Sequence, residues 1–132
     1  MNKSTGKLNL PAGIGRAGES AARSFVEHEL GYEVLETNFR TREGEIDIVA
    51  KSGSSLVFFE VKTRTNKKFG AGVEQISSNK AIRLQTTALR YLEHIDAPTI
   101  DWRIDLLSVE MSRSGVVRTV YHIRDAIEDQ EQ

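Results

Sequence analysis

The sequence predicts an α/β domain in which a mixed β-sheet is flanked by helices, with the elements in the order α-β-β-β-α-β-β. Two segments repeat apolar residues at helical spacing, and two neighbouring segments between them form strands around a short Gly-Ser turn. Two further strand-like segments follow the second helix. The 132 residues suffice for one domain, over residues 13–129, after a flexible tail over residues 1–12 that has no periodicity.

The first helix is expected over residues 13–30, where Gly31 supplies the stop signal. Its buried stripe comprises Ala22, Phe25, Val26 and Leu30. Glu19 lies three and seven residues before two members of this stripe, which is an unusual position for an acid. Alternatively, Glu19 lies in the first helical turn, where the helix dipole favours a negative charge.

Residues 32–40 are expected to form the first strand, and residues 45–51 and 55–64 a hairpin. Gly53-Ser54 suits a two-residue type II′ turn, because glycine stands first. A loop of two or four residues sets Asp47 directly opposite Glu60, whereas a loop of three residues shifts this pairing by one position.

The same pairing sets Glu45 opposite Lys62. Two carboxylates directly opposite each other destabilise a sheet unless one is protonated or a cation lies between them. We therefore expect Asp47 and Glu60 to bind a divalent metal such as Mg²⁺, with Lys62 beside the bound water or a phosphate. The alternative is an ordinary polar hairpin face, on which Glu45 and Lys62 form a surface ion pair.

Strand alternation places Glu60 and Lys62 on the face of Phe58, and the opposite face of this strand is expected to be the core. Residues 65–76 are expected to form a mobile basic loop. The second helix is expected from the caps at residues 77–79 to about Ile95. Strands are expected over residues 101–111 and 116–123, followed by a helical turn over residues 124–129.

The formal net charge of −1 hides a basic centre, since residues 40–90 carry ten basic and five acidic side chains. The candidates for phosphate contacts are Arg40, Arg42, Arg64, Lys67, Lys68, Lys80, Arg83 and Arg90. Lys80, Arg83, Thr87 and Arg90 share one face of the second helix, which is either a nucleic-acid-binding stripe or a solvated face.

The composition excludes several classes of site. The sequence has no cysteine, which rules out disulfides, thiolate zinc sites and a cysteine nucleophile. Its three histidines are widely spaced and are interpreted as ordinary residues. No apolar run approaches a membrane span and no signal peptide is recognisable, so a cytoplasmic protein without membrane attachment is expected.

Several segments in order carry a family resemblance: "GRAGESAA", "GYEVLETNFRTREGEIDIVA", "LVFFEVKTR", "FG" and "NKAIRL". They resemble the YraN family of small bacterial proteins, which are predicted endonucleases similar to archaeal Holliday junction resolvases of the PD-(D/E)XK superfamily. The resemblance implies a restriction-endonuclease-like core with Glu19, Asp47, Glu60 and Lys62 in the catalytic site. It also implies Lys80 at a later helical position, where the proline-rich entry expected before it is replaced by Ser77-Ser78-Asn79.

The leading functional hypothesis is a metal-dependent DNA endonuclease that uses Mg²⁺, or Mn²⁺, on branched or junction DNA as a homodimer. One alternative is a catalytically silent nucleic-acid-binding module with the same fold, which the modest net charge favours. Another is a structural or partner-binding domain whose acids form only surface ion pairs.

Overall fold

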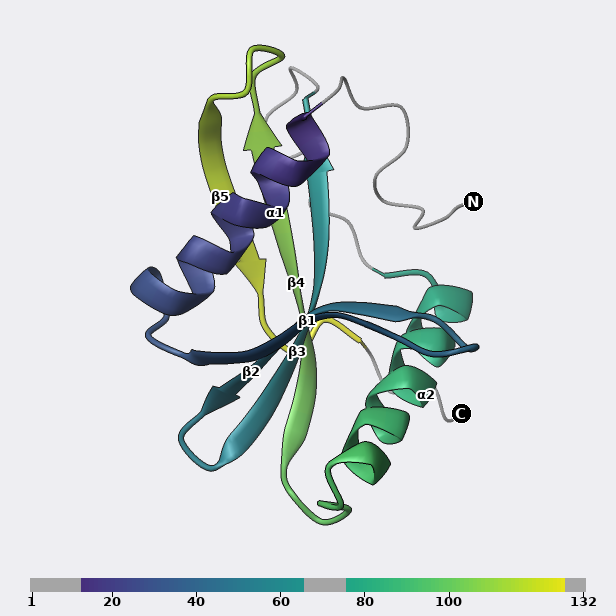
Figure 1. Cartoon of the computed structure of the whole chain (residues 1–132). Coiled ribbons are helices and arrows are strands. Elements are labelled where there is room, and N and C mark those ends of the chain that lie inside the picture. Colours follow the sequence, from purple (N-terminus) through teal and green to yellow (C-terminus); the bar gives the residue numbers. More distant parts are fainter. Residues whose placement is uncertain (1–12, 66–75, 128–132) are drawn as a thin grey trace.

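The computed structural model describes residues 13–65 and 76–127, which form one five-stranded sheet flanked by helices (Figure 1). The helical elements are α1 (Ile14–Ser24), the π-helical turn η2 (Phe25–Glu29) and α2 (Ser78–His94). The strands are β1 (Glu33–Arg40), β2 (Glu45–Ser52), β3 (Ser55–Arg64), β4 (Trp102–Met111) and β5 (Val117–Ile123). No helix within the described ranges is both long and apolar enough to cross a membrane.

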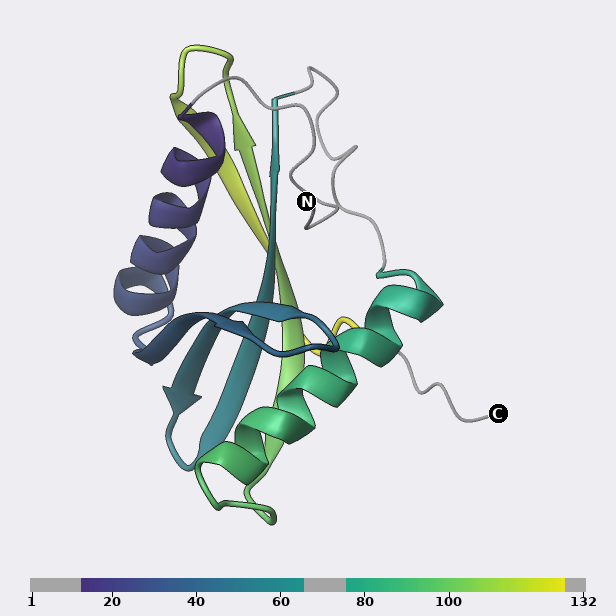
Figure 2. The ribbon, with the colours of Figure 1, turned by 45° about the vertical axis from the view of Figure 1, so that its right-hand side comes forward.

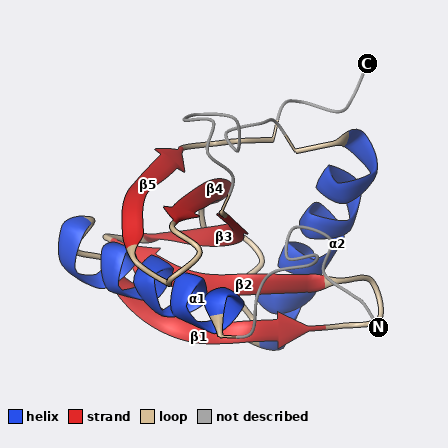
Figure 3. Ribbon diagram, turned by 90° about the horizontal axis from the view of Figure 1, so that it is seen from above, coloured by secondary structure: helices blue, strands red, loops and turns tan. Residues whose placement is uncertain are grey.

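The strands lie in sequence order across the sheet. Only β3 and β4 run parallel, and their arrows point the same way in Figure 1, whereas Figure 3 shows the sheet from above. A parallel pair needs a crossover connection, and α2 lies in it. The predicted fold class is confirmed, with the element order α-β-β-β-α-β-β. The expected tail and most of the expected basic loop lie outside the described residues. Residues 124–127 form a turn and not the expected helix.

Both faces of the sheet carry a hydrophobic core. α1 covers a cluster that includes Val57, Phe59 and Val61, whereas α2 covers a cluster around Phe58 on the other face. Figure 2 shows the two helices on opposite sides of the strands. The prediction that the Val57, Phe59 and Val61 face of β3 is core is therefore confirmed. The opposite face carries a second core around Phe58, which was not predicted from the sequence.

The β1–β2 ribbon changes faces halfway along its length. Ile48 packs in the cluster under α1, but Ile46, only two residues away, packs in the cluster under α2. Strict alternation would keep both on one face. The change occurs between Thr37↔Ile48 and Phe39↔Ile46, where Asn38 has a left-handed backbone with φ of 56°. This kink carries the tip of the ribbon over to α2 (Figure 1).

Candidate active site

Helix α1 presents Glu19 to the sheet because Gly18 allows a close approach. A Cβ atom on Gly18 would lie 2.6 Å from Cγ2 of Thr63, a buried residue of β3. Glu19 follows directly and is partly buried. The first turn of α1 contains no acid, so the alternative that Glu19 serves the helix dipole there was wrong.

Asp47 lies at the point where β2 separates from β3. The predicted hairpin register is confirmed as far as Ile48↔Phe59, and Gly53 has the positive φ that a glycine-first turn needs. The ladder ends there, and Asp47 Oδ2 instead accepts a hydrogen bond of 2.7 Å from the Val61 amide. Asp47 is only 5% exposed. Asp47 and Glu60 are therefore not a ladder pair, and the expected direct opposition of two carboxylates was wrong.

Glu60 is held by the first turn of α2. The Ser77 side chain caps this helix by accepting a hydrogen bond from the Lys80 amide, so the serine-rich entry does start the helix. Lys80 Nζ then lies 3.1 Å from Glu60 Oε2, and the Glu60 side chain is 2% exposed. Lys80, which was also expected to bind phosphate, is thus a cationic neighbour of Glu60 in this structure.

Lys62 follows Glu60 on the same face of β3 because side chains two apart on a strand point the same way. Along the parallel pair, Lys62 faces Ser108 and Arg64 faces Glu110. Glu110 is 2% exposed, so a second buried acid of β4 lies one step beyond the lysine. Glu110 was not singled out from the sequence, since no motif or spacing distinguishes it from the other polar residues of β4.

Glu45 pairs with β1 in the β1–β2 ribbon and is not paired with Lys62 of β3. It pairs with Arg40 in the ladder, and Arg40 Nε lies 3.4 Å from Glu45 Oε2. The register prediction that sets Glu45 opposite Lys62 in the β2–β3 ladder was therefore wrong, since that ladder ends at Ile48↔Phe59.

The donor set suits a small, hard cation. Mg²⁺ prefers oxygen ligands and is commonly held by one or two carboxylates, with waters and substrate phosphates completing its shell. Asp47 and Glu60 are buried carboxylates on adjacent strands. Among the described residues, no three His, Cys, Asp or Glu side chains are grouped closely enough to hold one ion, so Glu19 does not complete a three-acid cluster.

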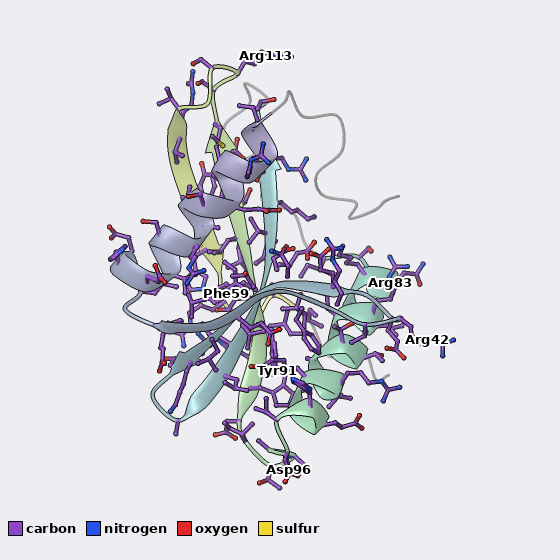
Figure 4. All side chains as sticks on the ribbon, viewed as in Figure 1. Arg42, Phe59, Arg83, Tyr91, Asp96 and Arg113 are labelled. Atoms are coloured by element: carbon purple, nitrogen blue, oxygen red, sulfur yellow. The ribbon has the colours of Figure 1, made fainter. Side chains whose placement is uncertain are left out.

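The basic candidates divide into paired and unpaired groups. Arg90 lies 3.2 Å from Glu43 at the ribbon tip and 3.4 Å from Glu93, and the Arg90 hydrogen bond holds the pKa of Glu43 below its ordinary value. Arg83 and Arg42 are exposed on the same side of the molecule (Figure 4) and form no hydrogen bond or ion pair within the described ranges.

Three other candidates differ from these arginines in their surroundings or lie outside the described residues. Thr87 is fully buried, and its Oγ1 would lie 3.2 Å from a Cβ atom on Gly44, so it interrupts the predicted polar stripe. Lys67 and Lys68 lie outside the described residues.

A buried polar network on β4 was missed by the sequence analysis. Asp105, fully buried, accepts hydrogen bonds from Arg103 Nε at 2.9 Å, His122 Nε2 at 2.8 Å and the Asp125 amide at 2.8 Å. Burial raises the pKa of Asp105, but the hydrogen bonds from His122 and Arg103 outweigh it and hold that pKa below its ordinary value. The network joins the two C-terminal strands, β4 and β5.

A pocket of about 290 Å³ lies between α1, β1 and the edge where β2 leaves β3. Glu19 and Asp47 both line it, which brings two of the predicted catalytic residues to one cavity. Glu60, Lys62 and Lys80 are not among its lining residues, since they lie towards α2.

Comparison with known proteins places the chain among bacterial relatives. Its sequence is 46% identical to a UPF0102 protein of Parafrankia sp. (strain EAN1pec), over 86% of this chain and 94% of the relative. It is 43% identical to one of Beutenbergia cavernae, over 84% and 92%, and 37% identical to one of Caldicellulosiruptor saccharolyticus, over 86% and 95%.

A solved structure of Pyrococcus furiosus SfsA in complex with Ca²⁺ matches at 15% identity and a TM-score of 0.43, over 87% of this chain and 65% of that one. Likeness at this level supports no statement about chemistry. The family model described as "Uncharacterised protein family UPF0102" matches residues 18–109, the stretch from α1 to β4 that contains Glu19, Asp47, Glu60 and Lys62. The chain therefore belongs to the UPF0102 family, in agreement with the YraN resemblance of its sequence.

Proposed function

We propose that this chain is a metal-dependent endonuclease that hydrolyses phosphodiester bonds in DNA, with branched or junction DNA as its substrate class. The observation that supports this best is that two acids on adjacent strands, Asp47 and Glu60, are buried at 5% and 2% exposure, since buried ionisable groups concentrate at functional sites. Lys62 stands two residues after Glu60 on the same strand, and Asp47 is oriented by the Val61 amide.

Each residue has a distinct role in this proposal. Asp47 and Glu60 hold Mg²⁺ or Mn²⁺, which when bound polarises the phosphate and acidifies a water. Lys62 stabilises the negative charge that develops on the phosphate and orients the attacking water. Lys80 balances the charge of Glu60 before substrate binds. Glu19 lies at the adjacent pocket and orients water there.

The substrate class suggests an assembly. A four-way junction has two-fold symmetry, so a symmetric homodimer would present one site to each of two strands. Analytical ultracentrifugation with and without a junction would detect this dimer.

The alternative is a nucleic-acid-binding module that does not cut. Two observations favour it: Glu60 already has a cationic partner in Lys80, and the described residues offer no group of three metal ligands. In that case the buried charges serve the fold, and DNA contacts come from Arg42 and Arg83.

A cleavage assay separates the two functions. Wild-type protein, Glu60→Gln and Glu93→Gln are incubated in Mg²⁺ or Mn²⁺ with junction, flap, linear duplex and single-stranded DNA. Glu93 is a matched control, since its side chain is 68% exposed. We expect wild type and Glu93→Gln to cut, EDTA to stop them, and Glu60→Gln to be slower by at least about 10²-fold. A wild type that binds but cuts none of these substrates supports the binding module.

A further inference from the structure

The pocket beside Asp47 offers hydrogen-bonding groups that the fold does not use. Thr37 and Asn38 of β1 line it, and their side chains form no hydrogen bonds within residues 13–65 and 76–127. Ile48 and Val61, 3% and fully buried, provide its apolar wall. A cavity with an apolar wall and a few uncommitted polar groups is typical of a ligand site.

The charges around the pocket favour a neutral ring over a bare phosphate. Arg16 and Arg23 project from one face of α1, being seven residues apart, but Glu19 and Asp47 line the same cavity. A phosphate inside would meet both acids. Arg23 is held by Glu27 at 3.1 Å, whereas Arg16 has no ion pair within the described part of the chain. Arg16 is exposed and is available to an anion outside the pocket.

The size of the pocket restricts what can enter. Its volume of about 290 Å³ lies at the lower end of the range for small-molecule sites, roughly 300–1,000 Å³. A base within a duplex cannot enter the pocket, because it would first have to break its base pair and leave the stack. An unstacked base presents both a ring for apolar contact and an edge for hydrogen bonds.

We propose that this pocket receives one unpaired nucleotide of a DNA strand. Its base lies against Ile48 and Val61, its edge bonds to Asn38 and Thr37, and its phosphate binds Arg16. This inference rests on the proposed function, since the pocket shares Asp47 with the proposed catalytic site. It predicts a preference for those branched DNAs that carry an unpaired nucleotide at the branch point, such as flaps and junctions with a bulged base.

The backbone of Asn38 provides a clean variant. Its φ of 56° lies in the left-handed region, which asparagine tolerates and glycine adopts freely. Asn38→Gly therefore removes the amide while it preserves the kink that shapes the pocket. Most other substitutions would disturb the β1–β2 ribbon as well.

The experiment measures binding without cleavage. Full-length protein in EDTA is titrated into a duplex and into the same duplex with one unpaired 2-aminopurine, and fluorescence anisotropy gives both affinities. We expect wild type to bind the unpaired DNA about tenfold more tightly and to raise the 2-aminopurine emission as the base unstacks. Asn38→Gly should lose most of this preference. Arg16→Ala should lower the log–log salt slope by about one unit.

Lys51→Ala is the charge-matched control, since Lys51 is an exposed cation at the far end of β2, and it should keep the preference and the slope. Wild-type preference in Asn38→Gly overturns the inference, as does unchanged 2-aminopurine emission. If wild type cleaves DNA but shows no preference for the unpaired nucleotide, only this inference is overturned. If wild type shows the preference but does not cleave in Mg²⁺, the inference is upheld and the proposed endonuclease activity is overturned. Binding to neither DNA overturns both.

Discussion

Replacing Gly18 with alanine tests how closely α1 must approach the sheet to present Glu19. The added Cβ would lie 2.6 Å from Thr63 Cγ2 and 3.0 Å from Thr63 Cβ. Thr63 is 2% exposed and cannot move aside. Overpacking of this kind costs about 1–3 kcal/mol, and the better helix propensity of alanine returns up to about 1 kcal/mol. We expect a net loss of about 1–2 kcal/mol in the free energy of unfolding.

Urea denaturation followed by circular dichroism measures this loss as a lower midpoint at unchanged slope. Ser24→Ala, at an exposed position of the same helix, is the control and should stay within about 0.5 kcal/mol of wild type. Thr63→Ala removes Oγ1 and Cγ2, the two atoms nearest the new methyl group, so the double variant should lose less stability than the two single losses added together. Full additivity, or a Gly18→Ala protein as stable as wild type, would refute the close-approach argument.

Calorimetry should detect Mg²⁺ or Mn²⁺ binding that both Asp47→Asn and Glu60→Gln abolish; unchanged heats in both variants contradict the metal site. The lowered pKa of Asp105 stabilises the fold fully above the unfolded value of about 3.9, and this contribution disappears as pH falls through the lower folded pKa. Asp105→Asn should therefore lose less stability than wild type as the pH falls below about 4, measured as the free energy of unfolding against pH. The same pH dependence in the variant and in wild type would contradict this. Arg83→Ala should lower the salt slope of DNA binding by about one unit, and ion-paired Arg90→Ala by less; equal slopes contradict this.

Local signals explain why most elements could be predicted from the sequence. The turn at Gly53-Ser54 fixes the hairpin register, and the Ser77 side chain caps α2 by accepting a hydrogen bond from the Lys80 amide, three residues away. These interactions join residues only a few positions apart. The sequences of the hairpin and of the start of α2 are therefore sufficient to predict these local structures.

The long-range features could not be predicted in the same way. The face change at Asn38 depends on where α1 and α2 pack, and neither helix is adjacent to it in the sequence. The Lys80–Glu60 ion pair likewise joins residues that only the α2 crossover brings together. The hairpin register predicted that Asp47 faces Glu60, but the ladder ends one pair earlier, at Ile48↔Phe59, and the Asp47 side chain accepts a hydrogen bond from the Val61 amide.

The central claim is that Lys62 takes part in phosphodiester hydrolysis at the site of Asp47 and Glu60. Single-turnover cleavage of the best branched substrate by Lys62→Met tests it directly, since methionine keeps most of the side-chain volume and removes the charge. We expect wild-type circular dichroism and metal-binding heats, with a cleavage rate lower by about 10²-fold or more. A Lys62→Met protein that cuts as fast as wild type would contradict the claim.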